Sequence, residues 1–204
     1  MTPVIVSQRV DLFPERHETR DALDQDLIGF LLAAGCLPVP LPNVLCKKMN
    51  NGRYNGNALE EWLWVIRPKA LILSGGNDIG QWPTRDLTET LMLEYAKREK
   101  CPVLGICRGM QMMAFWAGTE VKTVQGHVGS RHRVFGEITG EVNSYHNFSL
   151  KRCPNGYRKI ASSEDGEIEA IRHLSLLWEG WMWHPEREKL PSPRDIDRLR
   201  ALIQ

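Results

Sequence analysis

The chain has 204 residues, 42% of them hydrophobic, and its 26 lysines and arginines nearly balance 25 aspartates and glutamates, for a formal net charge of +1. This balance excludes the general electrostatic attraction that nucleic acid or an anionic membrane surface would require, and it favours a small-molecule partner. The length and apolar content are those of a single domain, expected here over residues 1–204.

The N-terminal residues and the cysteines indicate a cytoplasmic protein. MTPVIVSQRVDLFPER lacks the basic leader and apolar core of a signal peptide, and no apolar run reaches the roughly 18 residues of a membrane span. The five cysteines are odd in number, scattered, and contain no C-x-x-C pair. This pattern argues against a disulfide framework and against a structural zinc site. We therefore expect no metal and no cofactor.

Hydrophobic periodicity predicts alternating strands and helices in the first half of the chain. In chain order the expected elements are strand Val4–Ser7, helix Asp21–Ala34, edge strand Leu37–Leu41, helix Ala58–Ile66, strand Ala70–Gly76, helix Asp86–Lys100, strand Pro102–Ile106 and helix Gly109–Trp116. The polar, turn-rich segment Asn43–Asn57 is expected to be a loop. Repeated β-α units of this kind predict a parallel sheet with helices on both faces.

The second half changes character. Residues 121–171 are rich in Gly, Ser, Thr and Asn and contain short strand-like pieces, namely VKTVQ, HRVFGEI and GEIEAI. A further strand, Leu176–Trp183, and a terminal helix, Asp195–Ile203, follow. We expect a three-layer α/β/α, flavodoxin-like fold with a mostly parallel open sheet and added antiparallel strands. In such sheets the ligand crevice lies beyond the carboxyl ends of the strands.

The sharpest corner of the chain carries a cysteine. Gly105-Ile106-Cys107-Arg108-Gly109 has the form G-x-nucleophile-x-G between a strand and a helix, which pushes the central side chain out above the sheet. A position at a helix N-terminus also favours a thiolate. The alternative, a small buried apolar residue, is favoured for Cys36, Cys101 and Cys153. For Cys107 the two glycines favour a nucleophile.

A cysteine nucleophile needs a base, and the base needs a group that orients it. His184 follows a strongly apolar strand, and Pro185 then restricts the direction of the chain. Glu186 comes two residues after the histidine, where a turn can bring its carboxylate back to the imidazole. The alternative for this W-H-P-E sequence is a capped strand end with solvent-facing side chains.

Three motifs in order, LILSGGND, PVLGICRGMQ and WMWHPE, resemble the class I glutamine amidotransferase superfamily with its Cys-His-Glu triad. The RD-x-x-E pattern at Arg85, Asp86 and Glu89, together with NSYH at residues 143–146, most resembles γ-glutamyl hydrolases of the peptidase C26 type. The resemblance spans nearly the whole chain and implies the class I glutamine amidotransferase fold.

The resemblance also implies a role for each matched residue. Cys107 would attack the γ-carbonyl of a glutamine-like amide to form a thioester, with His184 moving the protons and Glu186 orienting it. The backbone N–H groups of Gly76 and Arg108 would form the oxyanion hole. The residues implied to contact the glutamyl group are Gly75, Gln111, Ser144, Tyr145 and His146. Gln111 has the alternative of a solvated helix residue, and the exact contacts of Tyr145 rest on the resemblance alone.

The leaving amine is less well defined by the sequence. Arg131, His132 and Arg133, with His127 nearby, are either a contact for an anionic leaving group or a solvated basic turn; Lys47, Lys48 and Arg53 leave the same two alternatives. Three classes of function remain: a stand-alone γ-glutamyl amide hydrolase, the glutaminase subunit of a two-component amidotransferase, and a non-catalytic sensor. The expected partners are therefore a γ-glutamyl small molecule and either a synthetase or a second copy of the chain.

Overall fold

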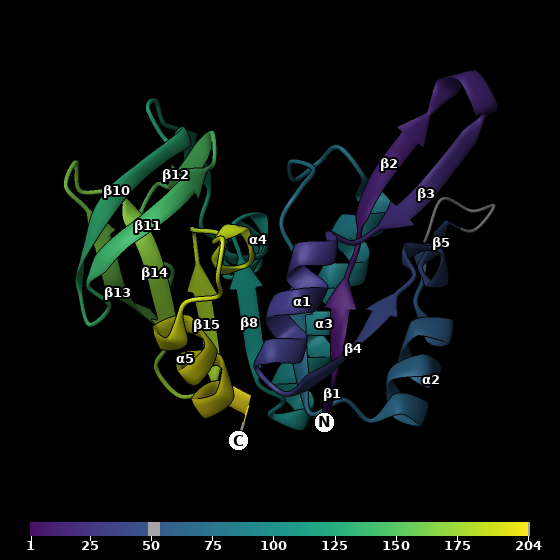
Figure 1. Cartoon of the computed structure of the whole chain (residues 1–204). Coiled ribbons are helices and arrows are strands. Elements are labelled where there is room, and N and C mark those ends of the chain that lie inside the picture. The colour runs from purple at the N-terminus through teal and green to yellow at the C-terminus, as the bar shows by residue number, and fades with distance from the viewer. Residues whose placement is uncertain (49–53, 204) are drawn as a thin grey trace.

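The computed structural model describes residues 1–48 and 54–203 and is built around a nine-stranded sheet (Figure 1). Five neighbouring strands are parallel, and they are, in sheet order, β4 (Cys36–Leu41), β1 (Thr2–Ser7), β7 (Ala70–Leu73), β8 (Val103–Ile106) and β15 (Trp178–Trp181). The proline-containing strand β4 lies at the edge, as predicted, because proline cannot donate a ladder hydrogen bond.

Antiparallel strands extend this sheet beyond β15. They are β14 (Ile168–His173), β13 (Tyr157–Ser163), β10 (Val128–Gly136) and β11 (Gly140–Tyr145). The predicted mixture of a parallel sheet with later antiparallel strands is therefore confirmed. The strand expected over Leu176–Trp183 is shorter than predicted, because only Trp178–Trp181 pair with β8 and the chain then turns toward His184.

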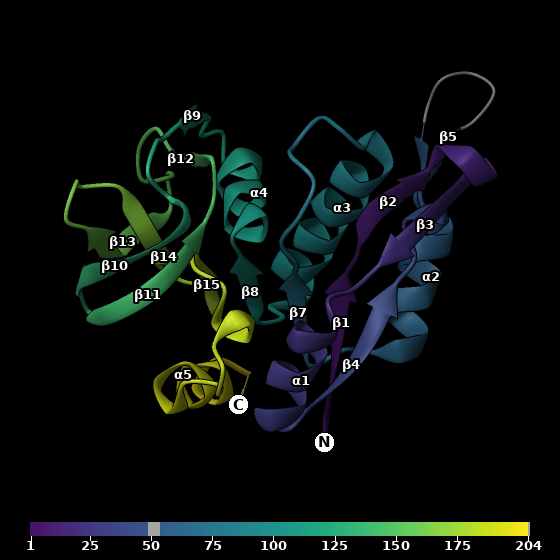
Figure 2. The same ribbon diagram turned by 45° about the horizontal axis from the view of Figure 1, so that its top comes forward.

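Helices cover both faces of the parallel strands (Figure 2). The helices are α1 (Gln25–Ala33), α2 (Asn57–Ile66), α3 (Pro83–Glu99), α4 (Arg108–Trp116) and α5 (Pro193–Ile203). Successive side chains of a strand point to opposite faces, so Ile72 packs in the cluster with α1 and α5, whereas Leu71 and Leu73 pack with α2, α3 and α4. None of the helices in the described residues is both long and apolar enough to cross a membrane.

A hairpin after β1 shortens the first helix. Asp21 and Ala22, which we expected to begin that helix, instead end β3 (Glu18–Ala22), which pairs with β2 (Arg9–Phe13). The helix begins after Asp24, whose carboxylate accepts the backbone N–H of Asp26 at 3.0 Å and so caps the first turn. The remaining short elements are β5 (Lys47–Lys48), β6 (Tyr54–Asn55), β9 (Val121–Thr123), β12 (Phe148–Leu150) and the single turns Pro14–Arg16, Asn43–Leu45 and Pro185–Arg187.

The difference between the centre and the edge of the sheet predicts unequal effects of the same substitution. Leu71 on central strand β7 is fully buried, whereas Leu37 on edge strand β4 is 48% exposed. Leu71→Ala should lower the free energy of unfolding by about 2–5 kcal/mol through lost burial and a cavity. Leu37→Ala should lower it by less than about 1 kcal/mol. Urea denaturation of both variants measures the free energy of unfolding. An equal decrease in the two variants would contradict the assignment of β7 to the centre and β4 to the edge of the sheet.

Candidate active site

The predicted functional residues lie at the carboxyl ends of adjacent parallel strands. Gly75 and Gly76 follow β7, Cys107 follows β8, and His184 follows β15. Because β7, β8 and β15 are neighbours in the sheet, these ends lie side by side. A parallel sheet places its ligand crevice at this edge.

The backbone of Cys107 has the strained geometry of a nucleophile-bearing turn. Its φ is +50° and its ψ is −106°, a region that non-glycine residues rarely adopt, and the residue is the N-cap of α4. Its N–H donates to the carbonyl of Trp181 at 2.7 Å. The corner is therefore held from the side of β15, the strand that carries His184.

The two glycines around Cys107 are required by close packing. A Cβ atom on Gly109 would lie 2.1 Å from the carbonyl oxygen of Leu73, and one on Gly105 would lie 2.6 Å from the carbonyl carbon of Gly109. Either contact is shorter than any real Cβ contact. The absence of side chains at both positions lets α4 begin directly against the end of β7, as the G-x-C-x-G pattern predicts.

His184 is oriented by two partners. Its Nδ1 lies 2.6 Å from Oε1 of Glu186, so Nδ1 carries a proton toward the carboxylate and Nε2 is the nitrogen available for chemistry. The side-chain oxygen of Asn143, on β11, accepts the His184 N–H at 2.9 Å, and its amide donates to the His184 carbonyl at 2.7 Å. Asn143 therefore positions the backbone of the histidine.

Charge around His184 favours its protonated form. Burial alone lowers the pKa of this imidazole, but Cys107 and Glu186 raise it, and together they bring the pKa from 6.5 to about 9. A protonated imidazole beside a cysteine is the pairing that supports a thiolate nucleophile.

A buried ion network lies beneath the corner. Arg85 on α3 donates to the backbone carbonyls of Ser74 and Gly75 at 2.8 and 2.9 Å and to the Glu89 carboxylate at 3.1 Å. Because Arg85 occupies these carbonyls, the turn after β7 is held in one orientation. Burial lowers the pKa of Arg85 to about 10, which leaves it charged at neutral pH.

The side chain of Arg108 enters the same network from α4. It forms ion pairs with Asp86 and with the other oxygen of Glu89, so its guanidinium is held within the buried network. Burial lowers the pKa of Arg108 to about 9. The RD-x-x-E pattern noticed in the sequence thus supplies the polar support of the nucleophile turn.

The two glycines of the SGG turn have different neighbours, His184 for Gly75 and Arg9 for Gly76. A Cβ on Gly75 would lie 2.8 Å from Cε1 of His184. Position 75 therefore requires glycine for the imidazole of His184 to occupy its observed position. Gly76 has a φ of +90°, which glycine adopts without strain. The assignment of the Gly76 and Arg108 N–H groups to an oxyanion hole stays a prediction.

Of four residues expected to contact a glutamyl group, three have buried side chains and only Tyr145 is exposed. The amide of Gln111 donates to the Phe148 carbonyl at 3.1 Å, and the Ser144 hydroxyl donates to the His127 carbonyl at 2.6 Å. Tyr145 is half-exposed and meets the His184 ring edge-on, with ring centroids 5.8 Å apart. His146 is buried and its imidazole lies beside that of His127. A contact of these four residues with substrate stays a prediction.

The basic sequence Arg131-His132-Arg133 does not form one cluster. Arg131 binds Glu141 and Glu188, at 2.5 and 3.0 Å, whereas His132 points toward Glu169. Adjacent residues of strand β10 face opposite ways, which separates the arginines from the histidine. Of the other candidate cations, Lys47 and Lys48 form β5, and Arg53 lies outside the described residues.

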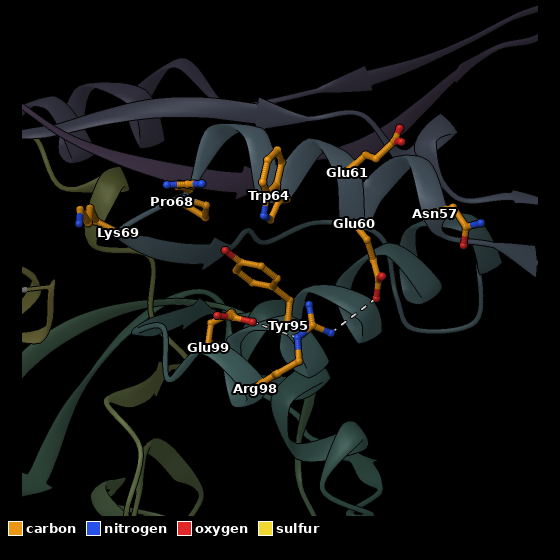
Figure 3. Close-up of a pocket in the computed structure, with 10 residues that line it drawn as sticks. Asn57, Glu60, Glu61, Trp64, Pro68, Lys69, Tyr95, Arg98 and Glu99 are labelled. Atoms are coloured by element: carbon orange, nitrogen blue, oxygen red, sulfur yellow. Dashed lines mark hydrogen bonds and ion pairs between the residues drawn. The ribbon is translucent and has the colours of Figure 1, made fainter.

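A wide groove of about 730 Å³ lies away from this site (Figure 3). Its walls come from α2 and α3 and include Trp64 and Tyr95, with Arg98 pairing Glu60. Lys69, which also lines it, immediately precedes β7, so the groove opens at the amino end of the strands. Cys107 lies at the opposite end, and we assign the groove no catalytic role.

Sequence reasoning did not assign roles to Asn143, Arg85 or Glu89. Arg85 and Glu89 were visible as part of a family pattern, and Asn143 as the first residue of NSYH. Their roles depend on contacts between residues that are distant in the chain, such as the 41 positions between Asn143 and His184. Local spacing carries no signal for such contacts.

Comparison with known proteins shows the fold and the family of the chain. The arrangement of strands and helices is the class I glutamine amidotransferase fold: the glutaminase domain of Trypanosoma brucei CTPS, with bound acivicin, superposes with a TM-score of 0.72 at 12% identity and covers 99% of this chain and 94% of that one. The chain belongs to the Peptidase C26 family, whose sequence profile matches residues 13–186.

Two relatives differ in what they act on. The γ-glutamyl-CDP-amidate hydrolase of Campylobacter jejuni is 36% identical over 126 residues, which span 59% of this chain and 63% of that protein. One of the subunits of the glutamine-hydrolysing GMP synthase of Methanocaldococcus jannaschii is 30% identical over 142 residues, 65% of this chain and 72% of that protein. The chain thus matches less than two thirds of the length of the first relative.

The surroundings of His184 predict an unusual titration. We expect its imidazole resonances to titrate near pH 9 in ¹⁵N NMR, and Glu186→Gln and Cys107→Ala each to move the midpoint toward 6.5. Since the folded-state pKa lies above the ordinary value, protonation of His184 stabilises the fold fully below pH 6.5, and this contribution is lost as the pH rises through about 9. A midpoint at or below 6.5 in the wild type would contradict the arrangement.

Proposed function

We propose that Cys107, His184 and Glu186 form a catalytic triad that hydrolyses a γ-glutamyl amide and releases L-glutamate. The observation that carries this proposal is the placement of His184, whose Nδ1 is bound by Glu186 at 2.6 Å while Cys107 raises its pKa. A base held in one tautomer next to a cysteine on a strained strand-to-helix turn is the arrangement of nucleophilic acyl transfer.

The chemistry follows in two halves. The Cys107 thiolate attacks the γ-carbonyl carbon, and the oxyanion accepts hydrogen bonds from the backbone N–H groups of Gly76 and Arg108. Protonated His184 delivers its proton to the leaving nitrogen, the C–N bond breaks, and a γ-glutamyl thioester remains on Cys107. His184 then takes a proton from water, whose oxygen attacks the thioester; the C–S bond breaks, glutamate leaves, and the Cys107 thiolate and protonated His184 are restored.

The glutamyl group would lie between Gly75 and the segment from Ser144 to His146. The side chains of Ser144 and His146 are bound within the protein, so we propose that this segment contacts the α-amino and α-carboxylate groups through its backbone, with Tyr145 covering them. Gln111 would contribute from the first turns of α4. The Phe148 carbonyl that now accepts its amide holds Gln111 beside the crevice.

The leaving amine that we favour is anionic. Arg9 and Arg187 are exposed and line the narrow cleft formed with Gly75, Gly76 and His184, and the Arg187 guanidinium lies 4.7 Å from the centre of the Tyr145 ring. Arginine is well suited to bind phosphate oxygens. With the relative from Campylobacter jejuni, this supports γ-glutamyl-CDP-amidate as the substrate, giving cytidine diphosphoramidate for capsule polysaccharide modification in the cytoplasm.

A second candidate function is a glutaminase subunit that supplies ammonia to a synthetase partner. It is supported by the 30% identity to a glutamine-hydrolysing GMP synthase component. Such a subunit would hydrolyse glutamine slowly alone and faster with its synthetase. Comparing the rates of glutamate release from L-glutamine and from γ-glutamyl-CDP-amidate therefore separates the two candidate functions.

The test is glutamate release by the purified chain from L-glutamine, simple γ-glutamyl amines and γ-glutamyl-CDP-amidate. We expect the amidate to be turned over fastest, and Cys107→Ala to lower the rate by a factor of about 1,000 or more. The matched control is Cys101→Ser, because Cys101 lies at the opposite end of β8 from Cys107. The Cys101 thiol donates a hydrogen bond to the Pro68 carbonyl, and burial raises the pKa of this thiol to about 12.

Two results would overturn the proposal. Full activity in Cys107→Ala would exclude the mechanism whatever the substrate. Turnover of glutamine alone, and only when a synthetase is added, would replace the first candidate function with the second.

The contact between Gly75 and His184 predicts a specific loss of activity. In Gly75→Ala the new methyl group would displace the imidazole, and kcat should fall about 10- to 100-fold. The matched control is Gly29→Ala on α1, where a Cβ meets nothing within 4 Å and where alanine should stabilise the helix by about 0.5–1 kcal/mol. Glutamate release measures kcat, and thermal unfolding measures the stability of both variants. An unchanged kcat in Gly75→Ala would show that His184 does not require the absence of a side chain at position 75.

A further inference from the structure

Three histidines and one glutamate converge in the antiparallel half of the sheet. His127 precedes β10, His132 lies within it, His146 follows β11, and Glu169 lies on β14. His127, His146 and Glu169 are buried, and the His132 side chain is 15% exposed. One nitrogen each of His127 and His132 and one oxygen of Glu169 lie within 4.8 Å of one another.

The centre of this cluster is a single carboxylate oxygen. Oε1 of Glu169 lies 3.4 Å from Nε2 of His132 and 3.5 Å from both Nδ1 of His127 and Nε2 of His146. The last two nitrogens are 3.2 Å apart. Ligands about 2.0–2.1 Å from a tetrahedral zinc ion lie roughly 3.3 Å from one another, so four of the six ligand separations are close to the edges of such a site.

In His127 and His146, the ring nitrogen that faces away from Glu169, here called the outer nitrogen, is hydrogen-bonded to another group. Nε2 of His127 lies 2.8 Å from a carboxylate oxygen of Asp165, and Nδ1 of His146 lies 3.0 Å from the Phe148 carbonyl. Both partners accept hydrogen bonds, so each outer nitrogen carries a proton. In the neutral form of both imidazoles, the inner nitrogens present lone pairs to each other and to Glu169.

Lone pairs directed at one another in a buried space require a cation between them. Within the described parts of the chain, no hydrogen bond of ordinary geometry reaches either oxygen of Glu169 or Nε2 of His132. An uncompensated buried carboxylate is strongly destabilising. The cation is either a metal ion or an additional proton on one of the imidazoles.

We propose that this cluster binds one Zn²⁺ ion. The four ligand atoms are Nδ1 of His127, Nε2 of His132, Nε2 of His146 and Oε1 of Glu169. Three imidazole nitrogens and one carboxylate oxygen suit zinc, and the outer contacts to Asp165 and Phe148 are those that orient metal-binding imidazoles. A pocket of about 280 Å³ lined by His127, His132 and Asp165 gives the ion access from solvent.

The site would be structural, because four protein ligands leave no open position on a tetrahedral ion. It joins β10, β11 and β14 at the side of the sheet nearest the triad. The Glu169 carbonyl accepts the N–H of Met182 at 2.7 Å, two residues before His184. The ion would therefore hold the antiparallel strands in position behind the catalytic histidine.

The experiment uses tag-free full-length protein carrying Cys107→Ala, so that the active-site thiol cannot bind the metal. After removal of metals with a chelator, ZnCl₂ is titrated by calorimetry, and the absorption of the Co²⁺ form reports coordination geometry. We expect one ion per chain, a tetrahedral Co²⁺ spectrum without a thiolate band, and a higher Tm with zinc. Adding His132→Asn, the least buried ligand, should weaken zinc binding more than about tenfold, since loss of even an outer partner costs that much.

His17→Asn provides the matched control, because His17 lies outside the cluster, in the hairpin between β2 and β3. It should bind zinc as the parent does. Absence of stoichiometric Zn²⁺ and Co²⁺ binding by the parent would overturn the proposal and assign the cation as a proton. Equal zinc affinity in the parent and in folded His132→Asn would also overturn it. If His132→Asn does not fold, the Co²⁺ spectrum of the parent decides the question.

Discussion

The carboxylate of Glu89 is the interaction on which the rest of the site depends. It is fully buried and receives Arg85 on one oxygen, Arg108 on the other, and the hydroxyl of Ser7 at 2.7 Å. Through these contacts it joins β1, α3, the turn after β7 and the start of α4. This charge lies between two buried guanidinium groups and compensates both, together with Asp86, and loss of one partner from such a group is strongly destabilising. Charge neutralisation in the interior thus determines the shape of the crevice above it.

The order of elements and the nucleophile turn could be predicted because their signals are local. The G-x-C-x-G pattern around Cys107 states directly that no side chain fits on either side, and the glycine contacts with Leu73 and within α4 give the reason. His184 and Glu186 are two residues apart, so a single turn brings them together. Alternation and apolar runs identified the parallel strands for the same reason.

The features that could not be predicted depend on contacts across the sheet. The hairpin of β2 and β3 replaced the expected start of α1 because pairing with a neighbouring strand outweighs helical periodicity at Asp21 and Ala22. Arg131 and His132 are neighbours in the sequence but take different partners because strand β10 turns them to opposite faces. His127 and His132 have the H-x4-H spacing that is typical of zinc ligands, but His146 and Glu169 come from other parts of the chain, so local spacing alone does not predict the whole site.

The positive φ of Cys107 also restricts which nucleophiles this corner can accept. A residue branched at Cβ is a severe outlier in that region of φ and ψ, whereas cysteine and serine have a single heavy atom on Cβ. Threonine is therefore excluded by backbone geometry before its reactivity matters. Exchange between thiol and hydroxyl chemistry at this position has one route, through serine, and a search for related enzymes with altered nucleophiles should begin with that substitution.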